Sequence, residues 1–70
     1  PDVFLHAAEM NGVAPEDCVV VEDSMSGFEA ASNAAMTCFA YDPKTTLKPT
    51  NLFGARRLTD LADLPKLLGL

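Results

Sequence analysis

The sequence predicts an α/β fold in which helices cover a parallel sheet, and three observations indicate it. The expected elements alternate as helix–strand–helix–strand–short strand–helix with short links, which is the pattern of βαβ units. The first expected strand, residues 18–21, is apolar without polar alternation, as is typical of a parallel strand covered on both faces. The helix after it carries alanines that allow close packing on a sheet. A right-handed crossover places such a helix over the sheet.

The first helix is predicted from Asp2, a candidate N-cap, to about residue 10. Apolar residues recur there with the spacing of one helical face, at Val3, Phe4, Ala7, Ala8 and Met10. Asn11 and Gly12 tolerate a left-handed backbone and are expected to end this helix. His6 lies on the same helix, away from the acidic residues described below, so we expect it to have a surface or core role.

The second helix is predicted over residues 26–35, with Ser24 as its N-cap. Its narrow packing face is formed by Ala30, Ala31, Ala34 and Ala35. Gly27 lies in the first turn and allows close packing or a tight turn. A second strand follows over residues 37–41, and residues 44–53 are expected to form an irregular loop.

In the last part of the chain, the residue pattern predicts a short strand over residues 55–58 and a final helix through about residue 68. Thr59 is the candidate N-cap of this helix, and Pro65 is the one residue that disagrees with it. Its apolar face holds Leu61, Leu64, Leu67 and Leu68. Arg56 and Arg57 form the only basic doublet, which we expect in a solvated turn rather than in a phosphate clamp.

The composition is that of a small globular domain and argues against several kinds of partner. The chain is 49% hydrophobic and carries a net charge of −5, and its five basic residues form no continuous basic face. These features argue against a nucleic-acid surface. No stretch approaches the roughly 20 apolar residues of a membrane span. Cys18 and Cys38 fall in expected strands, where cysteine behaves as a small apolar residue, so we expect a reduced, cytoplasmic protein.

The apolar strand over residues 18–21 also bears on domain organisation. Such a strand needs a neighbour on each side, and the chain offers only one or two others. We therefore expect residues 1–70 to be the C-terminal part of a larger doubly wound domain. Its first strands would lie upstream, so that the rest of the parent chain is a partner of this segment.

Two adjacent carboxylates, Glu22 and Asp23, directly follow this strand. Ligands of open α/β sheets bind just beyond the carboxyl ends of the strands. Two acids are costly to leave unpaired in a partly buried crevice, and Mg²⁺, which takes one or two carboxylates with waters and substrate phosphate, removes that cost. A charge pair at a helix N-terminus, worth about 0.3–1 kcal/mol per charge, explains the doublet equally well from the residues alone.

A family resemblance separates these two interpretations. The stretch Pro1-Asp2-Val3-Phe4 and the run Val-Val-Val-Glu-Asp-Ser-Met-Ser-Gly-Phe-Glu-Ala-Ala over residues 19–31 closely resemble the haloacid dehalogenase-like superfamily. The similarity is to its branch of β-phosphoglucomutase-like enzymes and sugar-phosphate phosphatases. It implies a Rossmann-like parallel three-layer α/β/α sandwich, of which residues 1–70 are the C-terminal segment. The first strands, the cap domain and the first three motifs of the family are absent from this segment.

The resemblance also implies a mechanism through an aspartyl-phosphate. The nucleophilic Asp and the motif Lys are expected upstream, so no catalytic residue is assigned within residues 1–70. Glu22 and Asp23 match the fourth motif: Asp23 would coordinate Mg²⁺ directly, and Glu22 directly or through water. Ser24 and Gly27 would form the structural turn near this site, with capping as the favoured role of Ser24.

The function expected of the intact parent is therefore that of a Mg²⁺-dependent phosphatase acting on a small phosphorylated metabolite such as a sugar phosphate. A phosphosugar mutase of the same family is the alternative, and the isolated segment is expected to be inactive. A third possibility is a non-catalytic module that binds a partner through the exposed edges of its sheet. A nucleotide-binding Rossmann half lacks the glycine-rich turn that it would need.

One position departs from the family pattern. Family members commonly carry Gly where this chain has Ala35, between the second helix and the second strand. If this position requires a positive φ, alanine costs on the order of 1 kcal/mol. Asn33 offers an earlier helix end that would absorb the difference.

Overall fold

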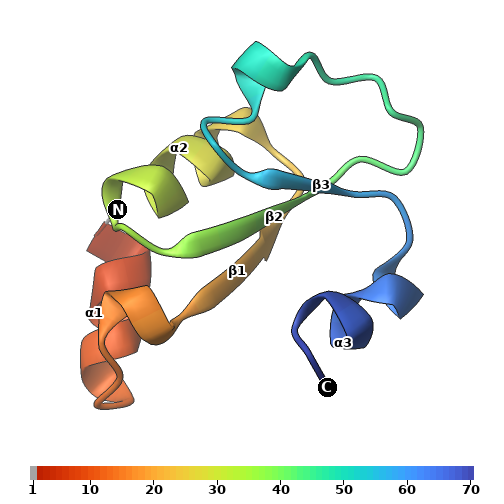
Figure 1. Cartoon of the computed structure of the whole chain (residues 1–70). Coiled ribbons are helices and arrows are strands. Elements are labelled where there is room, and N and C mark those ends of the chain that lie inside the picture. Colours follow the sequence, from red (N-terminus) through yellow and green to blue (C-terminus); the bar gives the residue numbers. More distant parts are fainter. Residues whose placement is uncertain (1) are drawn as a thin grey trace.

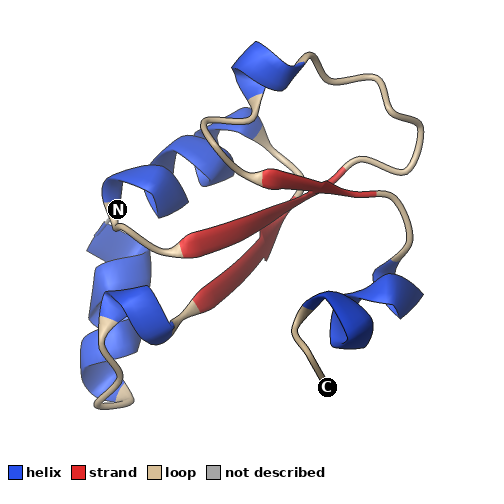
Figure 2. Ribbon diagram, in the orientation of Figure 1, coloured by secondary structure: helices blue, strands red, loops and turns tan. Residues whose placement is uncertain are grey.

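The computed structural model describes residues 2–70, so that Pro1 of the resembling stretch lies outside the described residues. Within this part, a parallel sheet contains β1 (Val19–Glu22), β2 (Thr37–Tyr41) and β3 (Arg56–Leu58) in that spatial order. Helices α1 (Asp2–Met10) and α2 (Met25–Asn33) lie on one side of the sheet, and α3 (Leu64–Leu67) lies on the other (Figure 1). The predicted α/β architecture, with helices on both faces of a parallel sheet, is confirmed (Figure 2).

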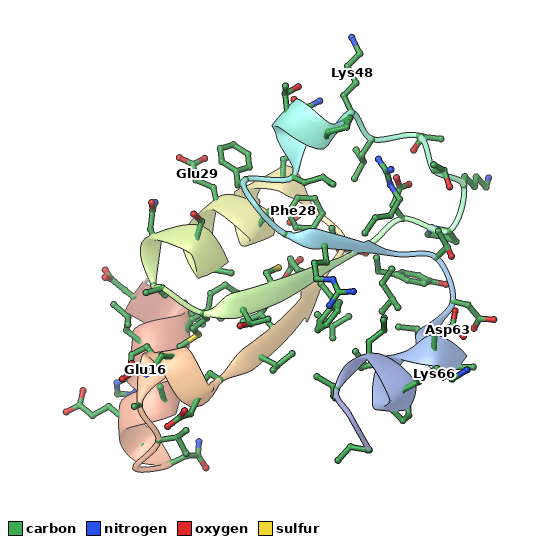
Figure 3. All side chains as sticks on the ribbon, viewed as in Figure 1. Glu16, Phe28, Glu29, Lys48, Asp63 and Lys66 are labelled. Carbon is green, nitrogen blue, oxygen red and sulfur yellow. The ribbon has the colours of Figure 1, made fainter. Side chains whose placement is uncertain are left out.

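The core lies between the sheet and α2. Phe28 and Ala31 of α2 are fully buried and pack with Cys38 and Ala40 of β2. Phe28 points toward the sheet, whereas its neighbour Glu29 points to solvent (Figure 3). Burial of a side chain the size of Phe28 stabilises the fold by about 1.5–3 kcal/mol. The small residues of α2 therefore serve the predicted purpose of bringing this helix close to the sheet.

A second cluster joins α1 to the same face of the sheet. Ala8 of α1, Ala34 and Met36 are buried together, with Phe4 and Val20 packed against them. Asp2, the predicted N-cap, lies in the first turn of this helix. Gly12 has a φ of +64°, in agreement with a helix end at this point.

Strand β1 is less enclosed than its sequence predicts. It pairs with β2 alone within residues 2–70, and Val19 and Val21 are 45% and 40% exposed. Its bounds also shift by one residue, because Glu22 pairs with Ala40 and so belongs to the strand. Cys18 precedes the strand, where its Sγ lies 3.5 Å from the carbonyl oxygen of Ala14. Coverage on both faces of β1 is therefore not found in the described residues.

The end of α2 confirms the strained alanine. The helix ends at Asn33 rather than at the predicted residue 35, yet Ala35 adopts a φ of +58°. The Met36 N–H donates to the Ala31 carbonyl, and the Ala35 N–H donates to the Ser32 carbonyl, both over 3.0 Å. This pair of bonds is the Schellman motif, whose left-handed position is usually occupied by glycine. Asn33 thus ends the helix without relieving Ala35.

The C-terminal segment departs most from the prediction. Asp60, not Thr59, provides the cap, because its Oδ1 accepts a hydrogen bond from the Ala62 N–H over 2.9 Å. One continuous helix was expected, but a 3₁₀ turn (Leu61–Asp63) precedes a single helical turn, α3. Pro65 explains the difference, because it is tolerated in the first turn of a helix but not in its interior.

Both cysteines are free thiols. Cys38 is buried, and burial, followed by the nearby negative charge of Glu22, raises the pKa of its thiol. Across residues 2–70, the helices are all too short and too polar to traverse a bilayer.

Candidate functional site

The acidic doublet lies at the carboxyl edge of the sheet. Glu22 is the last residue of β1 and is half-buried, whereas Asp23 follows it and is exposed. Helix α2 begins two residues later at Met25. The Glu22 side chain lies against Gly27 in the first turn of α2, and Glu22 and Asp23 both line a hollow at this edge of the sheet.

Ser24 organises the turn between β1 and α2. It caps α2 as predicted, because its Oγ accepts a hydrogen bond from the Gly27 N–H over 3.1 Å. The same hydroxyl group donates to Glu22 Oε1 over 3.2 Å, and the Asp23 N–H approaches this oxygen at 3.3 Å. A cap of this kind contributes about 1 kcal/mol to helix stability. Here it also orients the Glu22 carboxylate.

Gly27 is required by the close approach of Glu22. A Cβ atom at this position would lie 2.8 Å from Glu22 Oε1 and closer still to Cγ and Cδ of the same side chain. Any larger residue would therefore displace Glu22. The close approach at Gly27 is thus to the side chain of Glu22, in the first turn of α2, and not to another helix or strand.

Two depressions meet at Glu22. A hollow of about 280 Å³ at the carboxyl edge is lined by Val21, Glu22, Asp23, Tyr41 and Leu61. We call it the edge hollow. A groove of about 510 Å³ runs from Glu22 along α2 to the start of α1 and includes Asp2, Phe4 and Gly27. Because Glu22 lines both, it can be reached from either side of the turn.

The doublet fits a hard divalent cation. Glu22 Oε2 and both carboxylate oxygens of Asp23 accept no hydrogen bond from the described residues. Mg²⁺ is commonly held by one or two carboxylates, with waters and phosphate completing its octahedron. Among residues 2–70, however, His, Cys, Asp and Glu side chains nowhere gather in a group of three or more. The described chain thus offers two protein ligands at most at this place.

A third carboxylate at the same edge was not anticipated from the sequence. Asp42 follows β2 directly and is only 4% exposed. Its Oδ1 accepts from the N–H and Oγ1 of Thr46, at 3.1 and 3.2 Å. Its Oδ2 accepts from the Leu47 N–H at 3.0 Å and from Arg57 Nε at 3.2 Å. We call this set of contacts the Asp42 clasp, and Arg57 Nη2 completes it by donating to the Leu47 carbonyl.

The hydrogen bond from the Leu47 N–H makes the largest contribution to lowering the pKa of Asp42, and Thr46 and Arg57 add to it against the opposing effect of burial. The signal in the sequence was an aspartate placed directly after a strand and before a Pro-Lys-Thr-Thr turn. Aspartate commonly accepts hydrogen bonds from the backbone of such turns. Its pairing with Arg57, 15 residues away, had no local signal.

The basic doublet lies in β3, and the expectation of a solvated turn is wrong. Arg57 belongs to the Asp42 clasp, and its side chain is 26% exposed. Arg56 lies over the ring of Phe39, 5.6 Å from the ring centroid, in a cation–π contact. His6 is exposed on α1, as expected for a residue without a role in the site.

Comparisons with known proteins identify several similar sequences. No family profile matches the chain. A probable pseudouridine-5'-phosphatase from Drosophila melanogaster is 40% identical over 74 residues, which cover 100% of this chain and 32% of that protein. The beta-phosphoglucomutase of Bacillus subtilis is 47% identical over 36 residues, 51% of this chain and 16% of that enzyme. Overall, the chain spans between 4% and 32% of the length of the curated relatives that it matches.

Solved structures of haloacid dehalogenase-like proteins have a similar fold. A haloacid dehalogenase-like protein of unknown function from Agrobacterium tumefaciens superposes with a TM-score of 0.85 at 35% identity, over 99% of this chain and 34% of that one. A HAD family hydrolase from Deinococcus radiodurans, with bound phosphate and sodium, gives a TM-score of 0.82 at 36% identity, over 99% of this chain and 33% of that one.

Proposed function

This chain belongs to the haloacid dehalogenase-like superfamily, and on that basis we propose that it is the C-terminal core segment of a Mg²⁺-dependent phosphatase. The proposed substrate is a small phosphorylated metabolite such as a sugar phosphate. The rest of the parent chain would supply the first strands, the cap domain, the nucleophilic Asp and the motif Lys. Within this chain, Glu22 and Asp23 would be the metal ligands.

The observation that carries the proposal is the position of the two carboxylates and the small number of hydrogen bonds that they accept. They lie at the carboxyl edge, where ligands of α/β sheets bind, and three of their four oxygens accept no hydrogen bond from the described residues. The buried carboxylate of Asp42, by contrast, has both oxygens occupied by hydrogen bonds, as buried polar groups generally do. Phosphate bound in the Deinococcus radiodurans relative supports phosphate chemistry for this family.

The residues of the turn would act by position and charge. Ser24 and the Asp23 N–H hold Glu22 Oε1, and Oε2, which accepts no hydrogen bond from the described residues, would be free to bind the metal. Gly27 keeps the space that this orientation needs. Asp23, which lines the same hollow as Glu22, would offer the second carboxylate. When bound, Mg²⁺ supplies the positive charge that lets an anionic nucleophile approach a phosphate.

Two measurements test this proposal. The full-length protein should hydrolyse p-nitrophenyl phosphate with Mg²⁺, lose this activity in EDTA, and regain it when Mg²⁺ is added back. Activity that is indifferent to EDTA would contradict a metal-dependent phosphatase. The isolated 70-residue chain should be inactive under the same conditions, and hydrolysis by it would overturn the assignment of the nucleophile to the rest of the parent.

A phosphosugar mutase of the same family is the second candidate, supported by the identity to the Bacillus subtilis enzyme. Incubation of the full-length protein with β-glucose 1-phosphate separates the two. Release of inorganic phosphate indicates a phosphatase, and formation of glucose 6-phosphate without release indicates a mutase.

A candidate of another class is favoured by the open edge of β1. Val19 and Val21 are exposed on a strand that lacks a second neighbour within residues 2–70, and such edges recruit other chains. A non-catalytic module would bind a protein partner there and would leave p-nitrophenyl phosphate intact in every length of the protein. The two free cysteines support a reducing, cytoplasmic location for either candidate.

A further inference from the structure

The edge hollow has two chemically different sides. Glu22 and Asp23 form an anionic side, and Tyr41, Val21 and Leu61 form an aromatic and aliphatic side. Glu22 pairs with Ala40 in the register, so the next residues, Asp23 and Tyr41, lie level with each other. Neighbouring strands are about 4.8 Å apart, and side chains at paired positions point to the same face. Tyr41 and Asp23 thus follow paired positions of the two strands, and both line the edge hollow.

Tyr41 stands on an unusually well-fixed part of the edge. It pairs with Leu58 of β3, which is almost fully buried. The next residue, Asp42, donates its N–H to the Leu58 carbonyl over 2.9 Å and accepts the four hydrogen bonds of the Asp42 clasp. Leu61 follows Leu58 closely and lines the same hollow. These contacts hold the backbone from which the Tyr41 side chain extends, and sites on rigid elements place their side chains more precisely than sites on loops.

The two sides suit the two ends of one ligand. The phosphate of a phosphorylated metabolite belongs at the anionic side, where a bound cation would reverse the local charge. Its organic part then lies against the phenol and Leu61, since pockets bind ligands with apolar walls and a few placed polar groups. A phenol ring packs on the C–H face of a sugar, and its hydroxyl group can bond to a sugar hydroxyl.

We propose that Tyr41 is a specificity-determining residue that contacts the non-reacting part of the substrate, and that Asp42 is a positioning residue acting through it. This inference rests on the proposed phosphatase function. It adds that selectivity is exerted in part by the core segment, at the carboxyl end of β2.

The test compares two substrates in the full-length protein with Mg²⁺. Acetyl phosphate has almost no non-reacting part, and the second substrate is the sugar phosphate hydrolysed fastest among glucose 6-phosphate, fructose 6-phosphate, ribose 5-phosphate and 6-phosphogluconate. The variant Y41A should raise KM for the sugar phosphate about tenfold, the size expected when one well-formed contact is lost. Its kcat, its KM for acetyl phosphate and its half-saturating Mg²⁺ concentration should change less than about twofold. Y41F measures the share of the hydroxyl group and keeps the ring in place for folding.

A matched control is F53A, because Phe53 is an exposed aromatic residue near the opposite, amino-terminal end of the strands. It should leave both KM values unchanged. D42N should raise KM for the sugar phosphate in the same selective way, and the double variant Y41A/D42N should be no worse than Y41A alone, since the two residues would act as one unit. Additive effects in the double variant would overturn the positioning role.

The outcomes separate this inference from the function on which it rests. A wild-type protein that hydrolyses neither substrate with Mg²⁺ fails as a phosphatase, and the inference falls with it. A wild-type protein that is active, but whose KM values are unaltered or equally altered for both substrates by Y41A, overturns the role of Tyr41 and leaves the phosphatase intact. A wild-type protein that accepts acetyl phosphate and none of the sugar phosphates also overturns it.

Discussion

The turn after β1 and the turn after β2 each begin with an acidic residue at the same edge of the sheet, but they use it in opposite ways. After β2, both oxygens of Asp42 are occupied by hydrogen bonds from the chain, and the residue is buried. After β1, one oxygen of Glu22 is held and Asp23 accepts nothing from the described residues. The two turns therefore differ in how many carboxylate oxygens remain free to bind a ligand at the carboxyl edge of the sheet.

The sequences of the two turns explain the difference. The Pro-Lys-Thr-Thr-Leu stretch folds back over Asp42 and directs two backbone N–H groups at it. The Ser-Met-Ser-Gly stretch enters a helix at once: the Gly27 N–H donates to Ser24 Oγ, and the Ser24 hydroxyl group and the Asp23 N–H donate to Glu22 Oε1. The other three carboxylate oxygens of the doublet accept no hydrogen bond from the described residues.

The largest effect is expected at Asp23. In the full-length protein, D23N should lower kcat for p-nitrophenyl phosphate by about 10²–10³-fold, the loss typical of removing one group that stabilises transition-state charge. Thermal unfolding should change little, because Asp23 is exposed. The control D17N removes an equally exposed acid near the start of β1 and should leave kcat unchanged. A stable, fully active D23N protein would break the comparison between the turns.

The second effect concerns the space beside Glu22. In G27A, the added Cβ displaces the Glu22 side chain, so the Mg²⁺ concentration for half-maximal activity should rise about tenfold, as when an outer partner of a metal ligand is lost. S32A, on the exposed side of the same helix, is the control. An unchanged Mg²⁺ requirement in G27A would show that the orientation of Glu22 does not matter.

The third test uses acid to open the turn after β2. Because hydrogen bonds lower the pKa of Asp42 below its usual value of 3.8, the ionised carboxylate stabilises the folded state at neutral pH. This stabilisation is complete above that usual value and is lost as the pH falls from it through the folded pKa. Urea unfolding between pH 2 and 6 measures this effect. As the pH falls, the free energy of unfolding should decrease more steeply for the wild type than for D42N, and the difference in slope should correspond to the uptake of at most about one proton. Parallel curves would exclude a net stabilising charge at Asp42.

The smallest effect lies at a third turn, between α2 and β2, where no acid takes part. A35G should increase the free energy of unfolding by about 1 kcal/mol, because glycine adopts a positive φ without the Cβ conflict of alanine. A34G, at the neighbouring residue with a φ of −83°, should instead lose stability. Midpoints of urea unfolding measure both. A loss of stability in A35G would mean that the Schellman geometry is not strained.

Local patterns were enough for much of this structure. The order of elements, the Ser24 cap and the end of α1 follow from residues close to one another in the chain, as does the place of Glu22 and Asp23 at a strand end. Local patterns failed where two candidates stood side by side. Thr59 and Asp60 are both good N-cap residues. Strand β3 ends at Leu58, and the 3₁₀ turn begins at Leu61, so Asp60 occupies the capping position.

The sequence by itself determined that an acidic doublet follows an apolar strand and precedes a capped helix, because helix capping and strand composition act over a few residues. The tertiary structure alone decided which acids are available. Strand register sets Tyr41 beside Asp23, and Arg57 reaches Asp42 from 15 residues away. Such contacts depend on how strands align across the sheet, and a carboxylate is left open or satisfied only when that alignment is made.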